Sequence, residues 1–273
     1  MEFSIITASF KPGRKLIQTV KNILDQTFDD YEVIIKDGGS NDDSVEEMMK
    51  VPRIKAAVEA GKVMVHVQED KSVYDGMNQA ISLSKGDYLL FLNCGDAFHD
   101  KQVLEHVAKQ IEEASDIPTI YYGNTFCSRT GAMVHSAPSI TGFTCYRNIP
   151  CHQSCFYDRR LFEEKQYDTS LKVRADYDHF LWCYYVKKAA FQYLDLIISD
   201  YEGGGISEVK ENQRLDQEEH KLVTKRYMPA SELLKYKTIM LLTLAPLRRK
   251  LAEDSMFSGV YHRVKNRLYR KVE

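Results

Sequence analysis

The sequence has few of the features that would assign its 273 residues to a secreted, zinc-structured or nucleic-acid-binding class. The short apolar segment from Phe3 to Ala8 has the character of a strand, so no secretory signal peptide is expected there. Of six cysteines, only Cys151 and Cys155 are closely spaced, and no second pair completes a zinc site. The net charge of -2 gives no reason to expect a nucleic-acid partner. These absences favour a cytoplasmic protein with reduced thiols.

Two common phosphate-binding motifs are missing as well. The segment Asp37-Gly-Gly-Ser40 is not G-x-G-x-x-G, and no Gly-Lys-Ser/Thr follows it. A dinucleotide-dependent oxidoreductase is therefore disfavoured, and no Ser-His-Asp triad is recognisable. A nucleotidyltransferase remains an alternative, although residues 9–13 are a poor version of the glycine-rich, basic loop that such an enzyme would carry.

The chain does contain a regular alternation of strand-like and helix-like segments. Strand-like apolar segments cover residues 3–8, 31–36, 62–67 and 88–92. Apolar residues at helical spacing lie between them, and Pro52 disturbs the second of these helices. This order predicts an α/β fold with a mainly parallel, doubly wound sheet flanked by helices.

The second half of the chain is less regular. We expect further strands at residues 119–123, 132–136 and 191–199, a helix at 176–188, and helices beyond 210. The glycine-rich segment 203–207 is interpreted as a lid or hinge.

Polar clusters follow each of the first four predicted strands. They begin after Ala8, Lys36, Val67 and Leu92. Ligands of doubly wound sheets bind outside the carboxyl ends of the strands. We therefore expect these four clusters to face one crevice.

Three carboxylates in these clusters are candidate ligands. Asp96 ends Asn93-Cys-Gly-Asp96 directly after a strand, where it could bind a divalent metal that bridges a diphosphate. Asp37 could accept hydrogen bonds from a base or ribose, with Gly38 allowing close approach. For both, a simple turn is the alternative. Asp70 precedes a helix whose capping residues do not explain it.

The second half of the chain adds a candidate base and a histidine. Asp176 and Asp178 begin a helix, where acidic residues are stabilising in any case. Asp176 could act as a general base that faces the crevice. His152 could bind a diphosphate or an acceptor, and a purely structural histidine is the alternative.

Together these segments resemble the family 2 glycosyltransferases of the GT-A fold. The resemblance covers about three quarters of the chain, in unbroken order, through Ser4–Ser9, Gln26–Phe28, Tyr31–Asp42, Glu69–Asn78, Gly86–Asp96, His152–Ser154, Ala175–Asp178 and Gly204–Ser207. The forms Tyr-Asp-Gly-Met-Asn and Leu-Asn-x-Gly-Asp are most similar to bacterial enzymes of O-antigen and colanic-acid assembly.

The resemblance implies a role for each matching position. Asp176 would be the catalytic base, and Asp96 would hold Mn²⁺ or Mg²⁺. The nucleotide sugar would be bound by Thr7, Ala8, Ser9, Asp37, Gly38, Asp70, Asn78, Asn93, Cys94 and Gly95. The acceptor or the diphosphate would lie near His152, Gln153, Asp178 and Ser207.

The sequence departs from the family pattern at three places. The D-x-D metal element is reduced to Asn93-Cys-Gly-Asp96, which lowers the expected metal affinity. The glutamate that precedes the family's catalytic aspartate is Ala175 here, and the glycine-rich loop lacks a basic or histidine ligand. A catalytically inactive nucleotide-sugar-binding or assembly subunit is therefore an alternative.

The implied reaction is an inverting glycosyl transfer. The donor would be a nucleoside-diphosphate sugar, with a UDP-sugar favoured. The acceptor would be a hydroxyl of a saccharide or lipid-linked saccharide in cell-surface polysaccharide assembly.

The C-terminal part of the chain differs in charge. Residues 221–273 contain 13 Lys and Arg against 4 Asp and Glu, so we expect a catalytic domain at 1–210 and a basic helical extension at 211–273. The apolar stretch within 237–250 is shorter than the about 20 residues that span a bilayer. The extension either lies on the inner face of the cytoplasmic membrane or packs on protein, including a second copy in a homo-oligomer.

Overall fold

The computed structural model describes residues 2–111, 116–205 and 208–243. The chain divides into two compact units, residues 1–227 and 228–273. The first unit is built on a nine-stranded sheet with the strand order β3-β2-β1-β4-β8-β6-β9-β5, and β7 pairs with β6.

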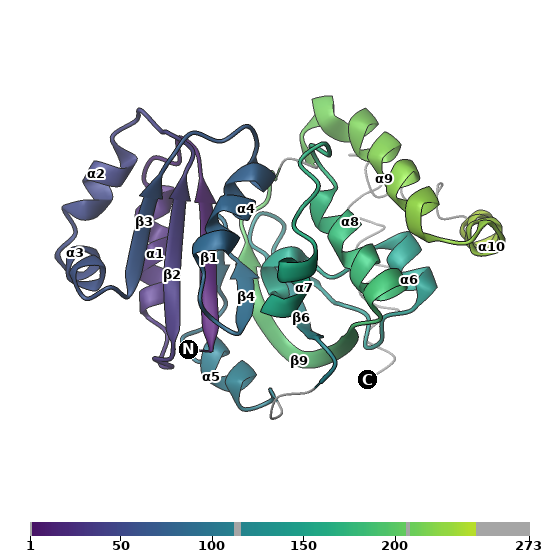
Figure 1. Ribbon diagram of the computed structural model, residues 1–273, viewed down its shortest axis with the longest axis horizontal. Helices are drawn as coiled ribbons and strands as arrows, with labels where there is room; N and C mark the ends of the chain where they lie inside the picture. Colours follow the sequence, from purple (N-terminus) through teal and green to yellow (C-terminus); the bar gives the residue numbers. More distant parts are fainter. Residues whose placement is uncertain (1, 112–115, 206–207, 244–273) are drawn as a thin grey trace. The chain divides into compact units, whose positions relative to one another are not determined.

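The N-terminal half of the sheet is parallel. It consists of β1 (Phe3–Ser9), β2 (Tyr31–Asp37), β3 (Val63–Val67) and β4 (Tyr88–Phe91), which Figure 1 shows side by side. Because these strands are parallel, their carboxyl ends meet at one edge of the sheet. The predicted parallel α/β sheet is confirmed.

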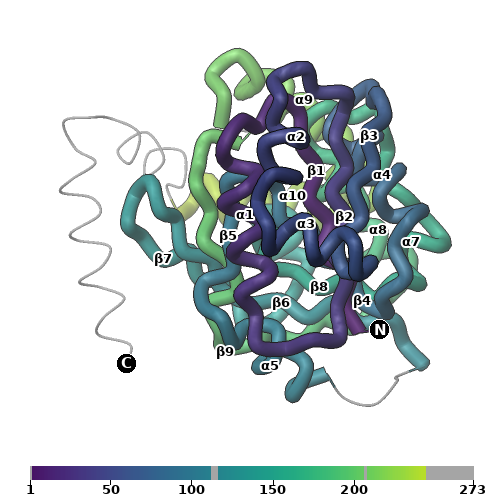
Figure 2. The backbone as a smooth tube through the Cα atoms, turned by 90° about the vertical axis from the view of Figure 1, so that its left-hand side faces the viewer, coloured from purple at the N-terminus to yellow at the C-terminus, as the bar shows by residue number. Residues whose placement is uncertain are grey.

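Helices cover both faces of this half. In Figures 1 and 2, α1 (Lys15–Leu24) and α4 (Val73–Leu83) lie on opposite sides of β1 and β2. Helix α1 buries Leu16, Val20 and Ile23, which recur at helical spacing. Strands covered on both faces are apolar on both, as the fully buried neighbours Ile5 and Ile6 show.

The segment after β2 forms two short helices. They are α2 (Ser44–Met49) and α3 (Pro52–Glu59). Pro52 occupies the first turn of α3, where a missing backbone N–H costs nothing, whereas inside a longer helix it would remove a hydrogen bond. The predicted disturbance at Pro52 is therefore a break between two helices.

The C-terminal half of the sheet is mixed. Strand β8 (Cys155–Asp158) is antiparallel to β4 and to β6 (Thr119–Cys127), and β6 is parallel to β9 (Ala190–Tyr201). The remaining strands are β5 (Ala97–Phe98) and β7 (Ala132–Val134). The strands predicted near 119–123, 132–136 and 191–199 are all present.

The helices of this half are short, apart from α9. They are α5 (Val103–Ala108), α6 (Gly142–Arg147), α7 (Arg159–Glu164), α8 (Ala175–Trp182) and α9 (Gln213–Tyr227). A π-helical turn at Cys183–Lys187 continues α8, and a 3₁₀ turn at His152–Ser154 precedes β8.

The second unit, as far as it is described, contains α10 (Ala230–Leu242). Because the compact units divide after Tyr227, α9 belongs to the first unit, and a functional division at residue 210 stays a prediction. Within the described residues, no helix combines the length and the apolar character needed to cross a membrane. Most of the basic tail lies outside these residues.

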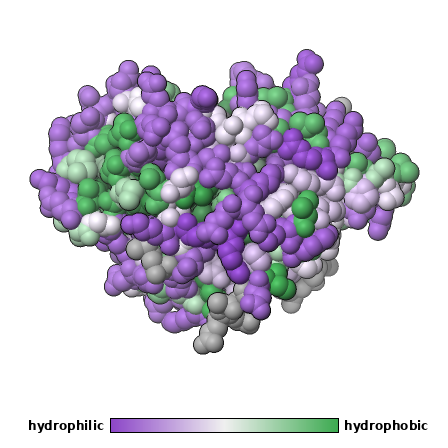
Figure 3. Space-filling view, in the orientation of Figure 1, coloured by the Kyte–Doolittle hydropathy of each residue, from purple (hydrophilic) through white to green (hydrophobic). Residues whose placement is uncertain are grey.

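The face of the molecule in Figure 3 is mainly hydrophilic, with a hydrophobic area over β3. Met64 and Val67 of this strand are exposed. Since β3 is the end of the sheet in the strand order, this area lies at the outer edge of the sheet, where Val67 pairs with Asp37 of β2.

Candidate active site

The turn after β4 has a conformation that requires glycine. Gly95 has φ +101°, and a Cβ there would clash with Oε2 of Glu202. Thr19 of α1 holds the turn, because its hydroxyl accepts from Gly95 N at 3.0 Å and donates to the backbone oxygen of Asp96 at 2.9 Å. The side chain of Asp96 is thereby fixed at the carboxyl end of the parallel strands.

Asp96 is a buried carboxylate with an altered proton affinity. Its Oδ1 accepts a hydrogen bond from Glu202 N at 3.1 Å. Burial raises the pKa of Asp96 to about 6, while the bond from Glu202 N and the charge of His152 act in the opposite direction. Lys15 and Glu202 form an exposed ion pair of 2.5 Å beside the turn.

Asp176 lies in the first turn of α8, where hydrogen-bond donors surround its carboxylate. Its Oδ1 accepts from Tyr177 N at 2.8 Å and from the hydroxyl of Tyr74 at 3.1 Å. Its Oδ2 lies 3.5 Å from Nδ1 of His152. Burial acts to raise the pKa of Asp176, but the bond and charge of His152 outweigh it, and the net shift is downward. Asp176 is therefore ionised at neutral pH and can accept a proton.

His152 connects Asp176 to the turn after β4. Its Nε2 lies 3.4 Å from Nδ2 of Asn93. Burial acts to lower the pKa of His152, whereas Asp176 and Asp96 raise it, and the net shift is upward. Among the residues that the structure describes, none is a hydrogen-bond partner of the buried Oδ1 of Asn93, so it is open to a donor or a cation of a ligand. The structure thus gathers Asn93, Asp96, His152 and Asp176 at one place.

A second group of predicted residues lines the ends of β1 and β2. Asp37 accepts from the hydroxyls of Ser9 at 3.0 Å and Ser40 at 2.7 Å, and from Ser40 N at 2.7 Å. The carboxylate of Asp37 is therefore engaged in stabilising the turn that follows β2. Thr7 donates to the backbone oxygen of Leu92 at 2.8 Å, which ties β1 to the turn after β4.

Asp70 remains more available to a ligand. Its Oδ2 pairs with the buried Lys36 at 3.0 Å, and its side chain is 15% exposed. Gly38 lies against this carboxylate. Asp37, Gly38 and Asp70 are therefore brought together, as the predicted crevice requires.

Other predicted residues are engaged elsewhere. The amide of Asn78 makes paired hydrogen bonds with the backbone of Tyr167, at 2.9 and 3.0 Å. Asp178 is fully buried in ion pairs with Lys165 and Arg226, where it joins α8 to α9. Gln153 is buried, Cys94 is partly exposed in the turn, and Ser207 lies outside the described residues.

Three contributors to the site were not predicted: Lys36, Glu202 and Thr19. Lys36 could have been found from the sequence, because it is an ionisable residue in an apolar strand-like segment. Glu202 and Thr19 could not have been found in this way, since both reach the turn from distant parts of the chain.

The oxygen donors at the turn fit a divalent metal that is held jointly with a ligand. Among the described residues, no group of three or more His, Cys, Asp or Glu could hold a metal by itself. Mg²⁺ and similar ions, however, usually bind through one or two carboxylates together with substrate phosphates. Asp96 supplies such a carboxylate, and the orphaned Oδ1 of Asn93 supplies a second oxygen.

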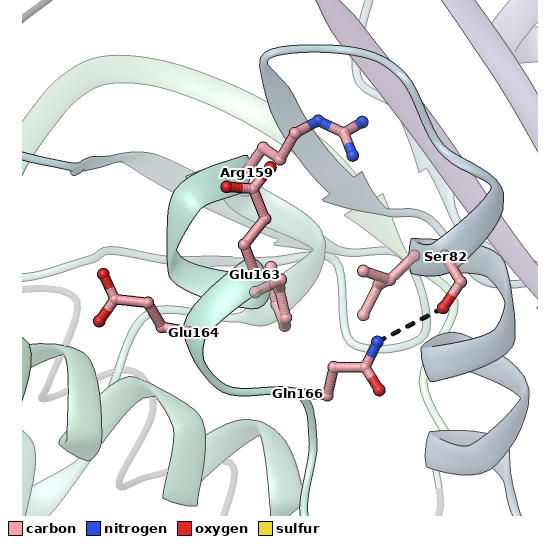
Figure 4. Close-up of a pocket in the computed structure, with 7 residues that line it drawn as sticks. Ser82, Arg159, Glu163, Glu164 and Gln166 are labelled. Atoms are coloured by element: carbon pink, nitrogen blue, oxygen red, sulfur yellow. Dashed lines mark hydrogen bonds between the residues drawn. The ribbon is translucent and has the colours of Figure 1, made fainter.

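A separate hollow lies between α4 and α7 (Figure 4). It is lined by Ile81, Ser82, Arg159, Phe162, Glu163, Glu164 and Gln166. None of the predicted site residues lines it, and Gln166 bridges it by donating to Ser82 at 3.4 Å. This hollow is distinct from the predicted nucleotide-sugar site.

Two solved structures with a similar fold are nucleotide-sugar complexes. Staphylococcus aureus TarS 1–349 in complex with UDP-GlcNAc has a TM-score of 0.61 at 16% identity, over 84% of this chain and 68% of that chain. In the longer TarS structure, the match covers 37% of that chain. Mannosyltransferase PcManGT from Pyrobaculum calidifontis, in complex with GDP-Man and Mn²⁺, has a TM-score of 0.61 at 12% identity, over 96% and 83% of the two chains. These similarities confirm the GT-A-like fold.

The sequence comparisons identify the family. A PGL/p-HBAD biosynthesis glycosyltransferase of Mycobacterium bovis is 32% identical over 209 residues, which cover 75% of this chain and 78% of that relative. Residues 4–164 match the family described as Glycosyl transferase family 2. The chain therefore belongs to glycosyltransferase family 2, as its motifs predicted.

Proposed function

We propose that the protein transfers a sugar from a nucleoside-diphosphate sugar, with a UDP-sugar favoured, to an acceptor hydroxyl, with inversion at the anomeric carbon. The proposal is supported mainly by the side chains that the structure brings together beside the turn after β4. Asp176, a proton acceptor, is joined through His152 to the turn that bears Asp96. A base and a diphosphate-side carboxylate at one site match a displacement reaction.

In this mechanism Asp176 accepts the proton of the acceptor hydroxyl. The oxygen forms a bond to the anomeric carbon while the bond from that carbon to the diphosphate breaks on the opposite face. Tyr74 and Tyr177 N hold one oxygen of Asp176, which leaves Oδ2, on the side of His152, to take the proton. The products are the glycoside and the nucleoside diphosphate.

Asp96, with Oδ1 of Asn93, would hold the divalent cation. Bound there, Mn²⁺ or Mg²⁺ would offset negative charge on the departing diphosphate. The family resemblance and the PcManGT complex, which contains Mn²⁺, support this assignment.

The nucleoside would lie over the ends of β1 and β2, beside Asp37, Gly38 and Asp70. The UDP-GlcNAc bound by TarS supports a UDP-sugar donor. The acceptor would be a saccharide or a lipid-linked saccharide of a cell-surface polymer. With a lipid-linked acceptor, the basic extension would contact the inner face of the cytoplasmic membrane.

The test is product formation by the purified chain and by Asp176→Asn. Release of UDP from UDP-sugars is followed with a panel of saccharide acceptors, and the anomeric configuration of the product is read by NMR. We expect an inverted product and a loss of turnover of about 10²-fold or more in the variant, with UDP affinity retained. Retained configuration would contradict the mechanism, and nucleotide binding without product would favour an inactive subunit.

A further inference from the structure

A fully buried lysine is the next-to-last residue of the inner strand β2. Lys36 has no exposed surface. Its ammonium donates to the backbone oxygens of Asp37 at 2.9 Å and Gln68 at 2.5 Å, and to Oδ2 of Asp70 at 3.0 Å. An ammonium has three donors, so all of them are used within the protein. Lys36 is therefore not itself available to a ligand.

The partner of this lysine is confined by two glycines. A Cβ at Gly38 would lie 2.7 Å from Oδ2 of Asp70, and a Cβ at Gly76 would lie 2.8 Å from the same atom. Any larger residue at either position would displace the carboxylate. Asp70 therefore occupies one position, with Oδ2 toward Lys36.

The other oxygen of Asp70, Oδ1, takes no part in the pair with Lys36. Within the described part of the chain, no residue donates a hydrogen bond to Oδ1, and the side chain keeps 15% exposure. A carboxylate oxygen of this kind accepts from a hydroxyl or an N–H. A nucleoside offers both kinds of donor.

Charge explains why a lysine is suited to this position. A nucleoside diphosphate is an anion, and an uncompensated carboxylate in the same partly buried crevice would repel it. The ammonium of Lys36 cancels the charge of Asp70 and leaves Oδ1 able to accept a hydrogen bond. It also ties the end of β2 to the backbone of Gln68, two residues before Asp70.

We infer that Lys36 is a positioning residue for nucleotide binding, which fixes Asp70 and neutralises it so that Oδ1 binds the nucleoside of an anionic donor. This inference rests on the proposed function. The two possible roles of Lys36 predict different results. Loss of a positioning lysine removes a positive charge and weakens binding of the anionic diphosphate more than binding of the nucleoside, whereas loss of a merely structural lysine affects both alike.

The experiment compares a nucleotide with its own nucleoside. Whichever of UDP, GDP and dTDP binds the full chain most tightly is titrated calorimetrically at about pH 8, where carboxylates are ionised, alongside the matching nucleoside. The variants are Lys36→Met, Asp70→Asn and the double variant. Lys50→Met, at an exposed lysine, is the matched control.

In Lys36→Met we expect the diphosphate to lose about tenfold or more in affinity, and the nucleoside clearly less. In the double variant, which has a neutral pair, we expect diphosphate affinity to return to within a few-fold of Asp70→Asn. This variant also provides a test if Lys36→Met alone does not fold. Lys50→Met should bind as the unaltered chain does.

Two results would overturn the inference. Unchanged diphosphate affinity in Lys36→Met, or equal losses for diphosphate and nucleoside, would leave Lys36 a structural residue while the proposed function stands. Absence of nucleotide binding by the unaltered chain would instead defeat the proposed function, and the inference with it.

Discussion

At the scale of single residues, the contact between His152 and Asp176 controls the basicity of the proposed base. A protonated His152 stabilises the carboxylate of Asp176, which makes that carboxylate a weaker proton acceptor. Once His152 is neutral, the contribution of its charge to this stabilisation is lost and Asp176 becomes more basic. The pKa of His152 is raised from 6.5 by Asp176 and Asp96, against the effect of burial.

Turnover is therefore expected to rise with pH through the raised pKa of His152, above 6.5. The measurement is kcat against pH with saturating donor. In His152→Gln, this rise should disappear, because no titrating group faces Asp176 from that side. His135→Gln, at an exposed histidine, should keep the profile. An unchanged rise in His152→Gln would show that another group controls it.

The site residues predicted from sequence are those in local motifs. Asp96, His152 and Asp176 were all proposed from their immediate neighbours, and the structure brings them together. Glu202 contacts Asp96 across 106 positions of sequence, and no local pattern marks it. For Asp37, the sequence left a turn and a ligand role as alternatives, because both have the same sequence pattern; in the structure its carboxylate accepts bonds within the turn.

At the scale of elements, α9 holds the start of α8 in place. Glu219 of α9 is buried and accepts from the backbone N–H groups of Lys172, Val173 and Arg174, at 2.8 to 2.9 Å. These three residues directly precede the turn that carries Asp176. The carboxylate therefore determines where the proposed base stands.

Glu219→Gln should lower the free energy of unfolding by about 1–3 kcal/mol, because an amide replaces an acceptor of charge-assisted hydrogen bonds. Turnover should fall as well, through displacement of Asp176. Urea unfolding and kcat measure the two effects. The control is Glu218→Gln on the same helix, whose exposed pair with Arg214 should contribute less than about 1 kcal/mol. Equal effects of the two substitutions would contradict this role.

Most helices and strands could be predicted from the periodicity of apolar residues and from the positions of proline and glycine. The four parallel strands were predicted from the apolar pattern. At Pro52 only a disturbance of one helix was predicted, and the structure has a break between α2 and α3. The π-helical turn at Cys183–Lys187 was not, because a predicted helix over 176–188 gives no sign of a change in hydrogen-bond spacing. The assignment of α9 to the first unit depends on tertiary contacts such as those of Glu219.

At the scale of the whole molecule, the basic extension provides the proposed contact with a membrane. Helix α10 exposes Leu234, Leu241 and Leu242, and the basic residues Arg248, Arg249 and Lys250 follow it in the sequence. Apolar and basic residues together favour an anionic lipid surface.

We expect the full chain to sediment with vesicles that contain anionic lipid and to stay in solution with neutral ones, with binding weakened by salt. Replacement of Arg248, Arg249 and Lys250 by Glu should abolish sedimentation. If the chain binds neither kind of vesicle and forms dimers in analytical ultracentrifugation, the extension is instead an oligomer contact.

The central claim, that the crevice binds a nucleoside diphosphate with a metal at Asp96, is tested most directly by calorimetric titration with UDP, GDP and dTDP, with and without Mn²⁺. The account predicts saturable binding of one nucleotide, strengthened by Mn²⁺ and lost in Asp96→Ala. Failure of all three nucleotides to bind at millimolar concentration would contradict it.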